Sequence, residues 1–355
     1  MRTGEGLVRI GLAGVGYWGP NLLRNFVQVR RCSVEAACDL RDDRLEYVRD
    51  HYPWVRTTKR IEDLLASPDL DAVVLATDPP THHAFARAAL GAGKHVLVEK
   101  PLAMRAEECR ELIRLAAARR LVLMVGHTFE YNAAVGQVKR YLDEGLLGEV
   151  YYAYAQRLNL GLVRSNTDVV WSLAPHDLSI LNYWFGVPPE TVSARGLSFL
   201  QPEARIADVA YLLLSYPGGR FAHVHLSWLD PNKVRQMTVV GSKKMLVYDD
   251  VSASEKIRIY DKGVTRKNLS HLDGYDDFGK FQLIHRAGDL LIPKLEFEEP
   301  LKLECEDFVR CVKEGGTPRS DGRSGLRVVR VLEAASRSMA DGGAPATIDW
   351  DPGDL

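Results

Sequence analysis

The segment that most constrains the fold of this chain is residues 14–19, Gly-Val-Gly-Tyr-Trp-Gly. It follows an apolar run, Val8 to Ala13, that is typical of a buried strand, and it precedes a helical pattern that begins at about Asn21. Glycines with this spacing allow a tight turn, close approach of the backbone to a pyrophosphate, and close packing of helix against strand. The helix N-terminus adds N–H groups and a favourable dipole. We therefore expect Gly14, Gly16, Tyr17, Trp18 and Gly19 to hold a dinucleotide.

An acidic residue ends the second predicted strand, Val34 to Cys38. Asp39 lies 20 residues after Gly19, where a carboxylate can bind both ribose hydroxyls of NAD and would repel a 2′-phosphate. Arg41 stands two positions further on and offers a way to accommodate NADP. The sequence therefore favours NAD as the cofactor over NADP.

Further apolar runs alternate with helical patterns, which predicts βαβ units around a parallel sheet. After about Val150 strands dominate, interrupted by a helix predicted from His176 to Phe185. The fold class expected is α/β: an N-terminal doubly wound Rossmann sheet followed by a C-terminal α+β domain on a large, mostly antiparallel open sheet. The runs that support the N-terminal sheet are residues 72–76, 95–98 and 121–125, with helical patterns at 81–92 and 105–119.

Length and composition limit the alternatives. A chain of 355 residues predicts two domains, which we place at 1–128 for dinucleotide binding and 129–355 for substrate binding and oligomerisation. The 46 Lys+Arg against 47 Asp+Glu provide no basic field for nucleic acid or an anionic membrane. The N-terminus carries no secretory signal pattern, and no apolar run nears the roughly 20 residues of a membrane span, so a cytoplasmic location is expected.

Cysteine and histidine patterns give no metal site. The five cysteines include no CxxC pair, and buried free thiols are the simpler interpretation. His223 and His225 point to one face of the strand Phe221 to Trp228 and could hold a metal, but a polar or subunit-contacting face is favoured because no third ligand is evident.

Two loops should face the cofactor, because ligands of open α/β sheets bind beyond the carboxyl ends of the strands. The first loop contains Thr77, Pro79 and His82; Thr81 is predicted to cap the following helix. The second begins with Glu99 and Lys100. A lysine held against cofactor and substrate is a candidate acid or base, although a solvated lysine at a strand end is the simpler explanation when it is taken alone.

Together these motifs resemble the Gfo/Idh/MocA oxidoreductases, whose members act on sugars, cyclitols and nucleotide sugars. The resemblance is carried by residues 14–19, the strand end at Asp39, ATDPPTHH at 76–83, GKHVLVEKPLA at 93–103 and GHTFEYN at 126–132. It covers the N-terminal half in order and spacing, and the C-terminal half more loosely. Within the family the chain is most similar to the branch that oxidises C3 of UDP-N-acetylglucosamine or its uronic acid.

The resemblance implies catalytic roles for Lys100 and for His176 within Trp171-Ser172-Leu173-Ala174-Pro175-His176-Asp177, and a cis peptide before Pro101. Many relatives carry an aspartate four residues before the histidine, where this chain has Ser172. Either Lys100 and His176 suffice, or another acid such as Asp177 compensates, or turnover is poor. Arginines suit a diphosphate substrate. The residues expected to bind substrate are Lys100, Tyr131, Arg157, Asn159, Arg164, Ser172, His176 and Arg235.

The expected activity is hydride transfer between a sugar hydroxyl and a nicotinamide, the sugar being a nucleotide-linked amino sugar or its uronic acid. A keto-sugar reductase and a dehydrogenase of cyclitols or free sugars are alternatives within the family. A non-catalytic NAD-binding regulator is an alternative of another class, favoured only by Ser172. The resemblance also implies a homodimer or homotetramer paired through the open sheets.

Overall fold

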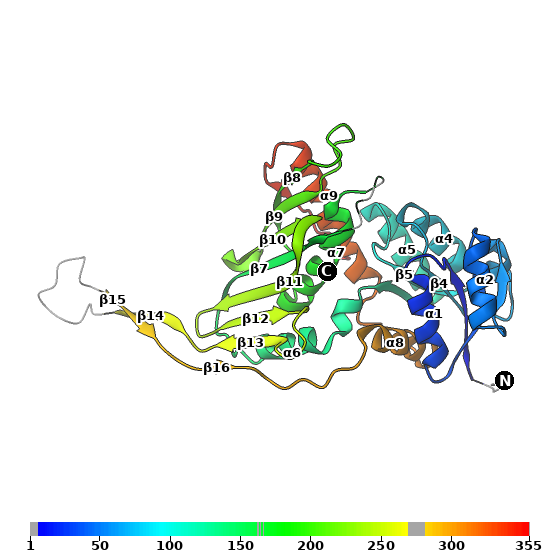
Figure 1. Cartoon of the computed structure of the whole chain (residues 1–355), viewed down its shortest axis with the longest axis horizontal. Coiled ribbons are helices and arrows are strands. Elements are labelled where there is room, and N and C mark those ends of the chain that lie inside the picture. Colours follow the sequence, from blue (N-terminus) through cyan, green and yellow to red (C-terminus); the bar gives the residue numbers. More distant parts are fainter. Residues whose placement is uncertain (1–5, 162, 164, 166, 269–280, 355) are drawn as a thin grey trace, which may run out of the picture.

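The computed structural model describes residues 6–354 apart from 162, 164, 166 and 269–280. Its N-terminal half is a parallel sheet in the order β3-β2-β1-β4-β5-β6, with helices on both faces (Figure 1). The strands are β1 (Val8–Ala13), β2 (Cys32–Cys38), β3 (Arg56–Thr58), β4 (Ala72–Leu75), β5 (His95–Glu99) and β6 (Leu123–Gly126). The helices are α1 (Gly19–Gln28), α2 (Asp42–His51), α3 (Ile61–Leu65), α4 (Pro79–Gly91) and α5 (Ala106–Arg119).

The Rossmann sheet predicted from the sequence is confirmed, and β1 has the predicted bounds. Three elements between β2 and β4 were not predicted. Helix α2 is mostly charged and buries only Leu45 and Val48, so its apolar periodicity is too weak to stand out. Helix α4 begins at Pro79, with Asp78 as its N-cap, so the prediction that Thr81 caps it is wrong.

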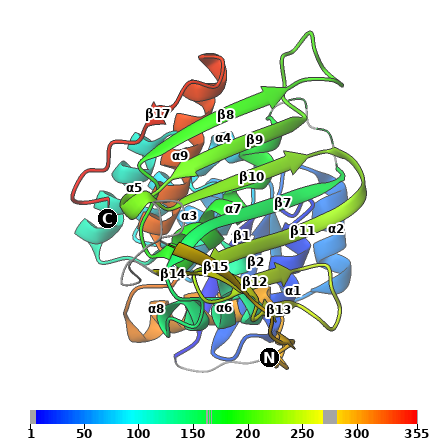
Figure 2. The same cartoon turned by 90° about the vertical axis from the view of Figure 1, so that its left-hand side faces the viewer.

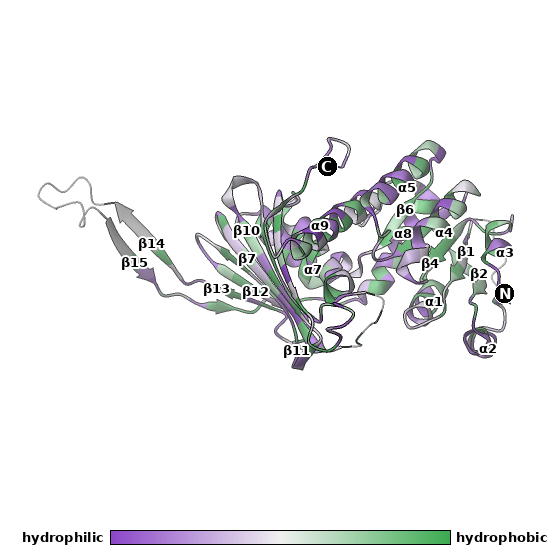
Figure 3. Ribbon diagram, turned by 90° about the horizontal axis from the view of Figure 1, so that it is seen from above, coloured by the Kyte–Doolittle hydropathy of each residue, from purple (hydrophilic) through white to green (hydrophobic). Residues whose placement is uncertain are grey.

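The C-terminal half is built on a sheet in the order β16-β13-β12-β11-β7-β10-β9-β8-β17, as Figure 2 shows face-on. Its pairs are antiparallel except β10 with β7, which confirms a mostly antiparallel sheet. The strands are β7 (Val150–Leu160), β8 (Thr191–Leu197), β9 (Val209–Ser215), β10 (Phe221–Ser227), β11 (Leu229–Gly241), β12 (Met245–Asp249), β13 (Ile257–Tyr260), β16 (Leu290–Leu291) and β17 (Ala346–Thr347). A separate hairpin, β14 (Gly263–Asn268) with β15 (Phe281–Arg286), extends away from the sheet (Figure 3).

Helices cover one face of this sheet. Helices α6 (Ala133–Asp143), α7 (Val169–Phe185) and α9 (Gly322–Ala340) enclose the C-terminal core with it. Helix α8 (Pro300–Glu314) instead packs with the N-terminal core, where Cys305 and Phe308 lie beside Phe26 of α1. The boundary at 128/129 stays a prediction; whichever boundary is chosen, α8 lies against the N-terminal sheet although it belongs to the later part of the chain.

Helix α7 begins seven residues earlier than the sequence pattern indicated, and Pro175 lies inside it. The Asp168 side chain caps the helix by accepting from the Trp171 N–H at 2.9 Å. Proline has no N–H, so the carbonyl of Trp171 lacks its helical donor at this point. The sequence had suggested that His176 begins this helix. In the structure His176 lies inside the helix, two turns after its start.

Candidate active site

The turn of residues 14–19 has the geometry that close approach of a phosphate requires. Gly14 has φ +92°, and a Cβ there would lie 2.4 Å from the carbonyl oxygen of Ala76. A Cβ on Gly19 would lie 2.1 Å from the Gly14 carbonyl oxygen, whereas the space beside Gly16 is open. Tyr17 is 87% exposed, Trp18 is partly exposed, and no side chain caps the N-terminus of α1. The residues present therefore fit a dinucleotide whose pyrophosphate lies against Gly16 and the start of α1.

Asp39 lies beside this turn at the end of β2. Its Oδ2 accepts from the Val15 N–H at 2.7 Å and its Oδ1 from the Arg41 N–H at 3.0 Å, which fixes the carboxylate and leaves further lone pairs for ribose hydroxyls. The Arg41 guanidinium is turned to Asp43, with N–O distances of 3.0 and 2.7 Å. Arg41, which the sequence offered as a way to accommodate NADP, is therefore paired with Asp43 in this structure.

The His82 side chain is buried between two backbone carbonyls. Its ring is buried and bridges two carbonyl oxygens, with Nδ1 2.7 Å from Pro101 and Nε2 2.9 Å from Thr77. Burial lowers the pKa of His82, so the neutral ring donates to one of these oxygens. The ring joins Thr77, in the loop after β4, to the turn after β5, and the expectation that His82 contacts the cofactor stays a prediction, as do those for Thr77 and Pro79.

Lys100 connects the N-terminal sheet to the C-terminal domain. It follows β5, and its Nζ donates to the carbonyl oxygen of Ser172 in α7 at 3.0 Å. The peptide bond between Lys100 and Pro101 is cis, as the resemblance implied. Ser172 thus contacts Lys100 through its backbone carbonyl. The carbonyl of the preceding residue, Trp171, is the one that Pro175 leaves without a helical donor.

His176 lies one helical turn after Ser172, on the same face of α7 as the Lys100 contact. Its ring is half-buried and packs edge-on against Phe129 at a centroid distance of 5.1 Å. Burial, followed by the nearby cations Lys100 and Arg157, lowers the pKa of His176 well below the ordinary value for histidine. The ring is therefore neutral near pH 7, the state in which it accepts a proton. The structure brings the two residues predicted to be catalytic to one place.

Arg157 is not a phosphate ligand in this structure. Its guanidinium is buried in a two-point ion pair with Asp177, at 2.8 and 2.9 Å, and stacks over the Phe129 ring at 4.8 Å. Arg157 was expected to contact the substrate, and Asp177 was one acid that could compensate at His176. In this structure the two side chains bind each other instead. The pair supports Phe129, which in turn packs on His176.

Of the other residues predicted to bind substrate, some lie near His176 and others do not. The Tyr131 hydroxyl is buried and donates to Asp307 at 2.8 Å, so it does not face a ligand as expected. Asn159 lies on the same face of β7 as Arg157 and is half-buried. Arg235 on β11 stands opposite Arg157 on the neighbouring strand β7. Its side chain is half-exposed, lies 3.6 Å from Asp250, and is near His176. Arg164 lies outside the described residues.

The sequence analysis did not single out two residues that the structure places near this site, Phe129 and Glu304. Phe129 supports His176, but a phenylalanine beside a strand end gives no separate signal of that role. Glu304 is fully buried in α8 beside the end of β5, about 200 residues from Glu99 in sequence. A glutamate at an otherwise apolar position of an amphipathic helix was the signal that could have revealed it.

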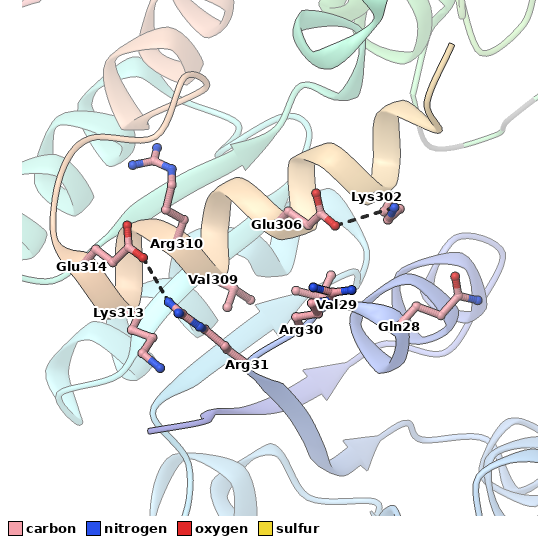
Figure 4. A pocket seen from close by; sticks show the side chains of 10 residues that line it. All are labelled: Gln28, Val29, Arg30, Arg31, Lys302, Glu306, Val309, Arg310, Lys313 and Glu314. Atoms are coloured by element: carbon pink, nitrogen blue, oxygen red, sulfur yellow. Dashed lines mark hydrogen bonds and ion pairs between the residues drawn. The ribbon is translucent and has the colours of Figure 1, made fainter. Parts of the chain in front are cut away.

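A charged hollow of about 230 Å³ between α1 and α8 is not part of this site (Figure 4). Arg30 and Arg31 lead into the start of β2, so the hollow lies at the amino ends of the strands. Its cations face acidic partners, with Arg31 3.3 Å from Glu314 and Lys302 3.8 Å from Glu306. Within the described ranges, no three His, Cys, Asp or Glu side chains are grouped to hold a metal, and no helix is long and apolar enough to cross a membrane.

The chain has a Rossmann sheet with a phosphate-binding turn, and a lysine and a histidine lie together at the carboxyl ends of its strands. This combination is typical of an NAD-binding oxidoreductase. Residues 8–127 match the model of the GFO/IDH/MocA oxidoreductase family with an NAD-binding Rossmann fold, and residues 135–247 match the GFO/IDH/MocA C-terminal domain. The uncharacterized oxidoreductase YdgJ of Escherichia coli is 32% identical over 247 residues, 66% of this chain and 69% of the relative. The chain belongs to the Gfo/Idh/MocA family.

Relatives of named activity differ in substrate. UDP-N-acetylglucosamine 3-dehydrogenase of Acidithiobacillus ferrooxidans is 27% identical over 91% of this chain and 94% of the relative. Myo-inositol 2-dehydrogenase of Thermotoga maritima is 23% identical over 94% and 97%. The WlbA dehydrogenase of Bordetella pertussis, solved with NADH and UDP-GlcNAcA, has a TM-score of 0.77 at 21% identity, covering 97% of this chain and 100% of that one; it shows the same fold.

Proposed function

We propose that this protein is an NAD-dependent dehydrogenase of a nucleotide-linked amino sugar or its uronic acid, acting at C3. The observation that carries the proposal is the meeting of Lys100 and His176: the Lys100 Nζ binds α7 at Ser172, one turn before the neutral His176 ring. Two polar groups beside the carboxyl ends of β5 and β6 suit a reaction in which a hydroxyl loses a proton as its carbon loses a hydride.

The roles of the two side chains follow from their surroundings. His176 is neutral because burial and cations disfavour its charged form, so it accepts the proton of the sugar hydroxyl. Lys100 donates hydrogen bonds and holds the reacting oxygen between itself and His176. The nicotinamide, when bound, accepts the hydride. Phe129, held by Arg157, keeps the His176 ring in place.

The nucleotide-sugar class is supported by Arg235 and by the relatives. Arg235 is half-exposed, and the accessible part of its guanidinium offers N–H donors to a diphosphate. The Acidithiobacillus relative is a UDP-N-acetylglucosamine 3-dehydrogenase, and the WlbA structure contains UDP-GlcNAcA. NAD in preference to NADP is supported by the fixed Asp39 carboxylate and by Arg41 being paired with Asp43.

The test is formation of reduced nicotinamide by the purified protein across UDP-N-acetylglucosamine, its uronic acid, free glucose and inositol, with NAD⁺ and NADP⁺ in parallel. We expect a signal with a UDP-sugar and NAD⁺. A signal with inositol or glucose alone would move the protein to the cyclitol or free-sugar class. Silence with every alcohol calls for the reverse assay with keto-sugars, and silence there too, with cofactor still bound, would favour the non-catalytic regulator that Ser172 suggests.

Restoring an acid in α7 tests whether Ser172 limits turnover. Ser172 is half-buried beside Lys100, so in Ser172→Asp a carboxylate would lie one turn from His176 and favour its protonated form. We expect the pH at which the oxidation rate is half-maximal to rise in this variant. Ser172→Asn is the matched control of similar size without charge. Identical pH–rate profiles for the three proteins would show that position 172 does not act on His176.

We also propose that two copies pair through the uncovered face of the nine-stranded sheet. Its side chains form stacked pairs, Tyr152 with Phe221 and Tyr211 with His225, and Leu213 is 47% exposed. We expect Leu213→Lys to shift the protein toward monomer in sedimentation velocity, with Val251→Lys on a separate loop as control. A wild-type monomer at micromolar concentration would contradict the proposal.

A further inference from the structure

A two-stranded hairpin leaves the body of the protein, and the described part of the chain gives it no supporting layer. Its strands, β14 (Gly263–Asn268) and β15 (Phe281–Arg286), pair with each other and with no other described strand. Figures 1 and 3 show no described helix lying along it. An isolated two-stranded hairpin is at best marginally stable in water, and a third strand or a helix normally supports it. The hairpin therefore has the form of an element that another molecule supports.

Both faces of the hairpin expose apolar side chains. Val264 is 52% exposed and lies opposite His285 in the ladder. Ile284 is 42% exposed and belongs to the other face, because it directly precedes His285 and successive strand residues alternate. A hairpin packed on its own sheet would bury at least one of these two side chains. The hairpin thus offers apolar contact area on both sides.

The sheet edge beside the hairpin is also apolar and exposed. Strand β16 is the outermost strand of the nine-stranded sheet and, among the described strands, pairs only with β13. Its two residues, Leu290 and Leu291, are exposed, and so is Ile292 directly after them. Only three residues separate β15 from β16, so the hairpin and this edge adjoin. Exposed apolar edge strands pair with other chains unless something covers them.

The direction of the hairpin indicates what covers it. Its base is fixed by Arg286, which forms an ion pair with Asp261 at 3.3 Å and donates to the carbonyl oxygen of Lys243. From there the hairpin extends outward on the side of the sheet that carries no helices (Figures 1 and 3), and Figure 2 shows it in front of that face. This is the face with the stacked aromatic pairs, through which we propose that two copies pair.

The length of the hairpin exceeds the thickness of such a contact. Each strand has six residues, which at about 3.4 Å per residue span about 20 Å. Two sheets that pack face to face lie about 10 Å apart. A molecule seated on the uncovered face therefore lies beside the hairpin, and the hairpin extends past the sheet of that molecule.

We propose that the hairpin and the adjoining edge strand form an arm, residues 263–268, 281–286 and 290–292, that grips a second copy of this chain. One copy seated on the uncovered face contacts both that face and the arm. In a two-fold dimer each copy lays its arm along the other, so both arms are covered at once. The inference rests on the pairing of copies proposed above and adds the element that holds them. It involves neither cofactor nor substrate, so the arm can fail while the dehydrogenase holds, and the reverse.

Removal of the hairpin is the first test. Gly263 and Arg286 lie opposite each other in the ladder, so Asn-Gly in place of residues 264–285 closes the chain with a two-residue turn and keeps the base. We expect the dissociation constant of the dimer, measured by sedimentation velocity over a dilution series, to rise about 100-fold, with NADH binding unchanged. A dissociation constant equal to that of the wild type would overturn the arm alone. A wild-type monomer at micromolar concentration would overturn the arm together with the pairing of copies.

A single substitution tests the same surface with the hairpin in place. Ile284→Asp puts a charge into the covered surface and should raise the dissociation constant about tenfold. Val251→Asp is the matched control, because Val251 is similarly exposed and lies in the turn between β12 and β13, at the end of β13 away from the hairpin. The control should behave like the wild type. Equal weakening in both variants would trace the effect to added charge and count against the arm.

Cross-linking identifies the molecule that the hairpin contacts. Tagged chains with the photoreactive residue benzoylphenylalanine in place of Ile284 are co-expressed with untagged wild-type chains and irradiated after purification. We expect an adduct of one tagged and one untagged chain, and the same residue in place of Val251 should give none. Cross-links confined to peptides of the tagged chain itself would show that the hairpin folds back on its own sheet, and would overturn the proposal.

Discussion

Turnover by His176→Asn falls by about 10²–10⁴-fold while NADH still binds, if His176 accepts the hydroxyl proton. The asparagine side chain fills part of the same space and cannot take the proton. Phe129 packs on the ring edge, and Arg157 and Asp177 remain paired, so the surrounding structure keeps its partners. The measurement is the initial rate of NADH formation with saturating substrate, alongside NADH binding followed by fluorescence.

Lys100→Met is the companion variant. Methionine keeps the length and apolar stem of lysine but removes the donor to the Ser172 carbonyl, so both kcat and substrate affinity should fall. The loss in the double variant should be smaller than the product of the two single losses, since residues that act as a unit are not additive. A fall of less than tenfold in each single variant, with cofactor bound, would show that neither group takes part in proton transfer.

The pH dependence of the wild-type enzyme follows from the same ring. The pKa of His176 is lowered, so the ring stays neutral until the solution is more acidic than the ordinary histidine value. At saturating NAD⁺, which removes any effect of pH on cofactor affinity, the oxidation rate should hold through neutral pH and fall only below it. A rate that already halves near the ordinary histidine pKa would mean that a ligand or another group reverses this shift.

The fold and the phosphate turn could be predicted because their signals are local. The bounds of β1 and the glycines of residues 14–19 depend on neighbours within a few residues, and a Cβ on Gly14 or Gly19 would collide with backbone there. The place of Lys100 at a strand end is also local, because a short apolar run defines that strand, whereas its catalytic role was implied by the family resemblance. These features need no knowledge of distant partners.

The side chains that sequence patterns describe least well have partners far away in sequence. Arg157 finds Asp177, Tyr131 finds Asp307, and His82 bridges to Pro101, so three side chains expected to contact ligands are satisfied by the protein. A polar residue beside a site has the same local pattern whether it faces a ligand or a buried partner. The start of α7 was missed because Pro175 suggested a helix boundary where the helix only loses one donor.

The largest effect on stability is expected for the buried pair of Arg157 and Asp177. Asp177→Asn should lower the free energy of unfolding by about 3–5 kcal/mol, because it leaves the guanidinium buried without its counter-charge. The pair joins β7 to α7, so loss of its carboxylate also loosens the helix that carries His176. Urea unfolding of the wild type and the variant at neutral pH measures the difference.

The double variant Arg157→Met with Asp177→Leu tests whether the ion pair only fills the core or also positions α7 for catalysis. Replacing both charges with apolar side chains removes the cost of burying them, so stability should return to within about 1–2 kcal/mol of the wild type or exceed it. Turnover should not return, because Phe129 loses the guanidinium stacked on its ring and His176 loses its fixed neighbour. Full recovery of both stability and activity would show that the pair only fills the core. Stable but slow protein would show that these charges hold α7 in the position that the chemistry needs.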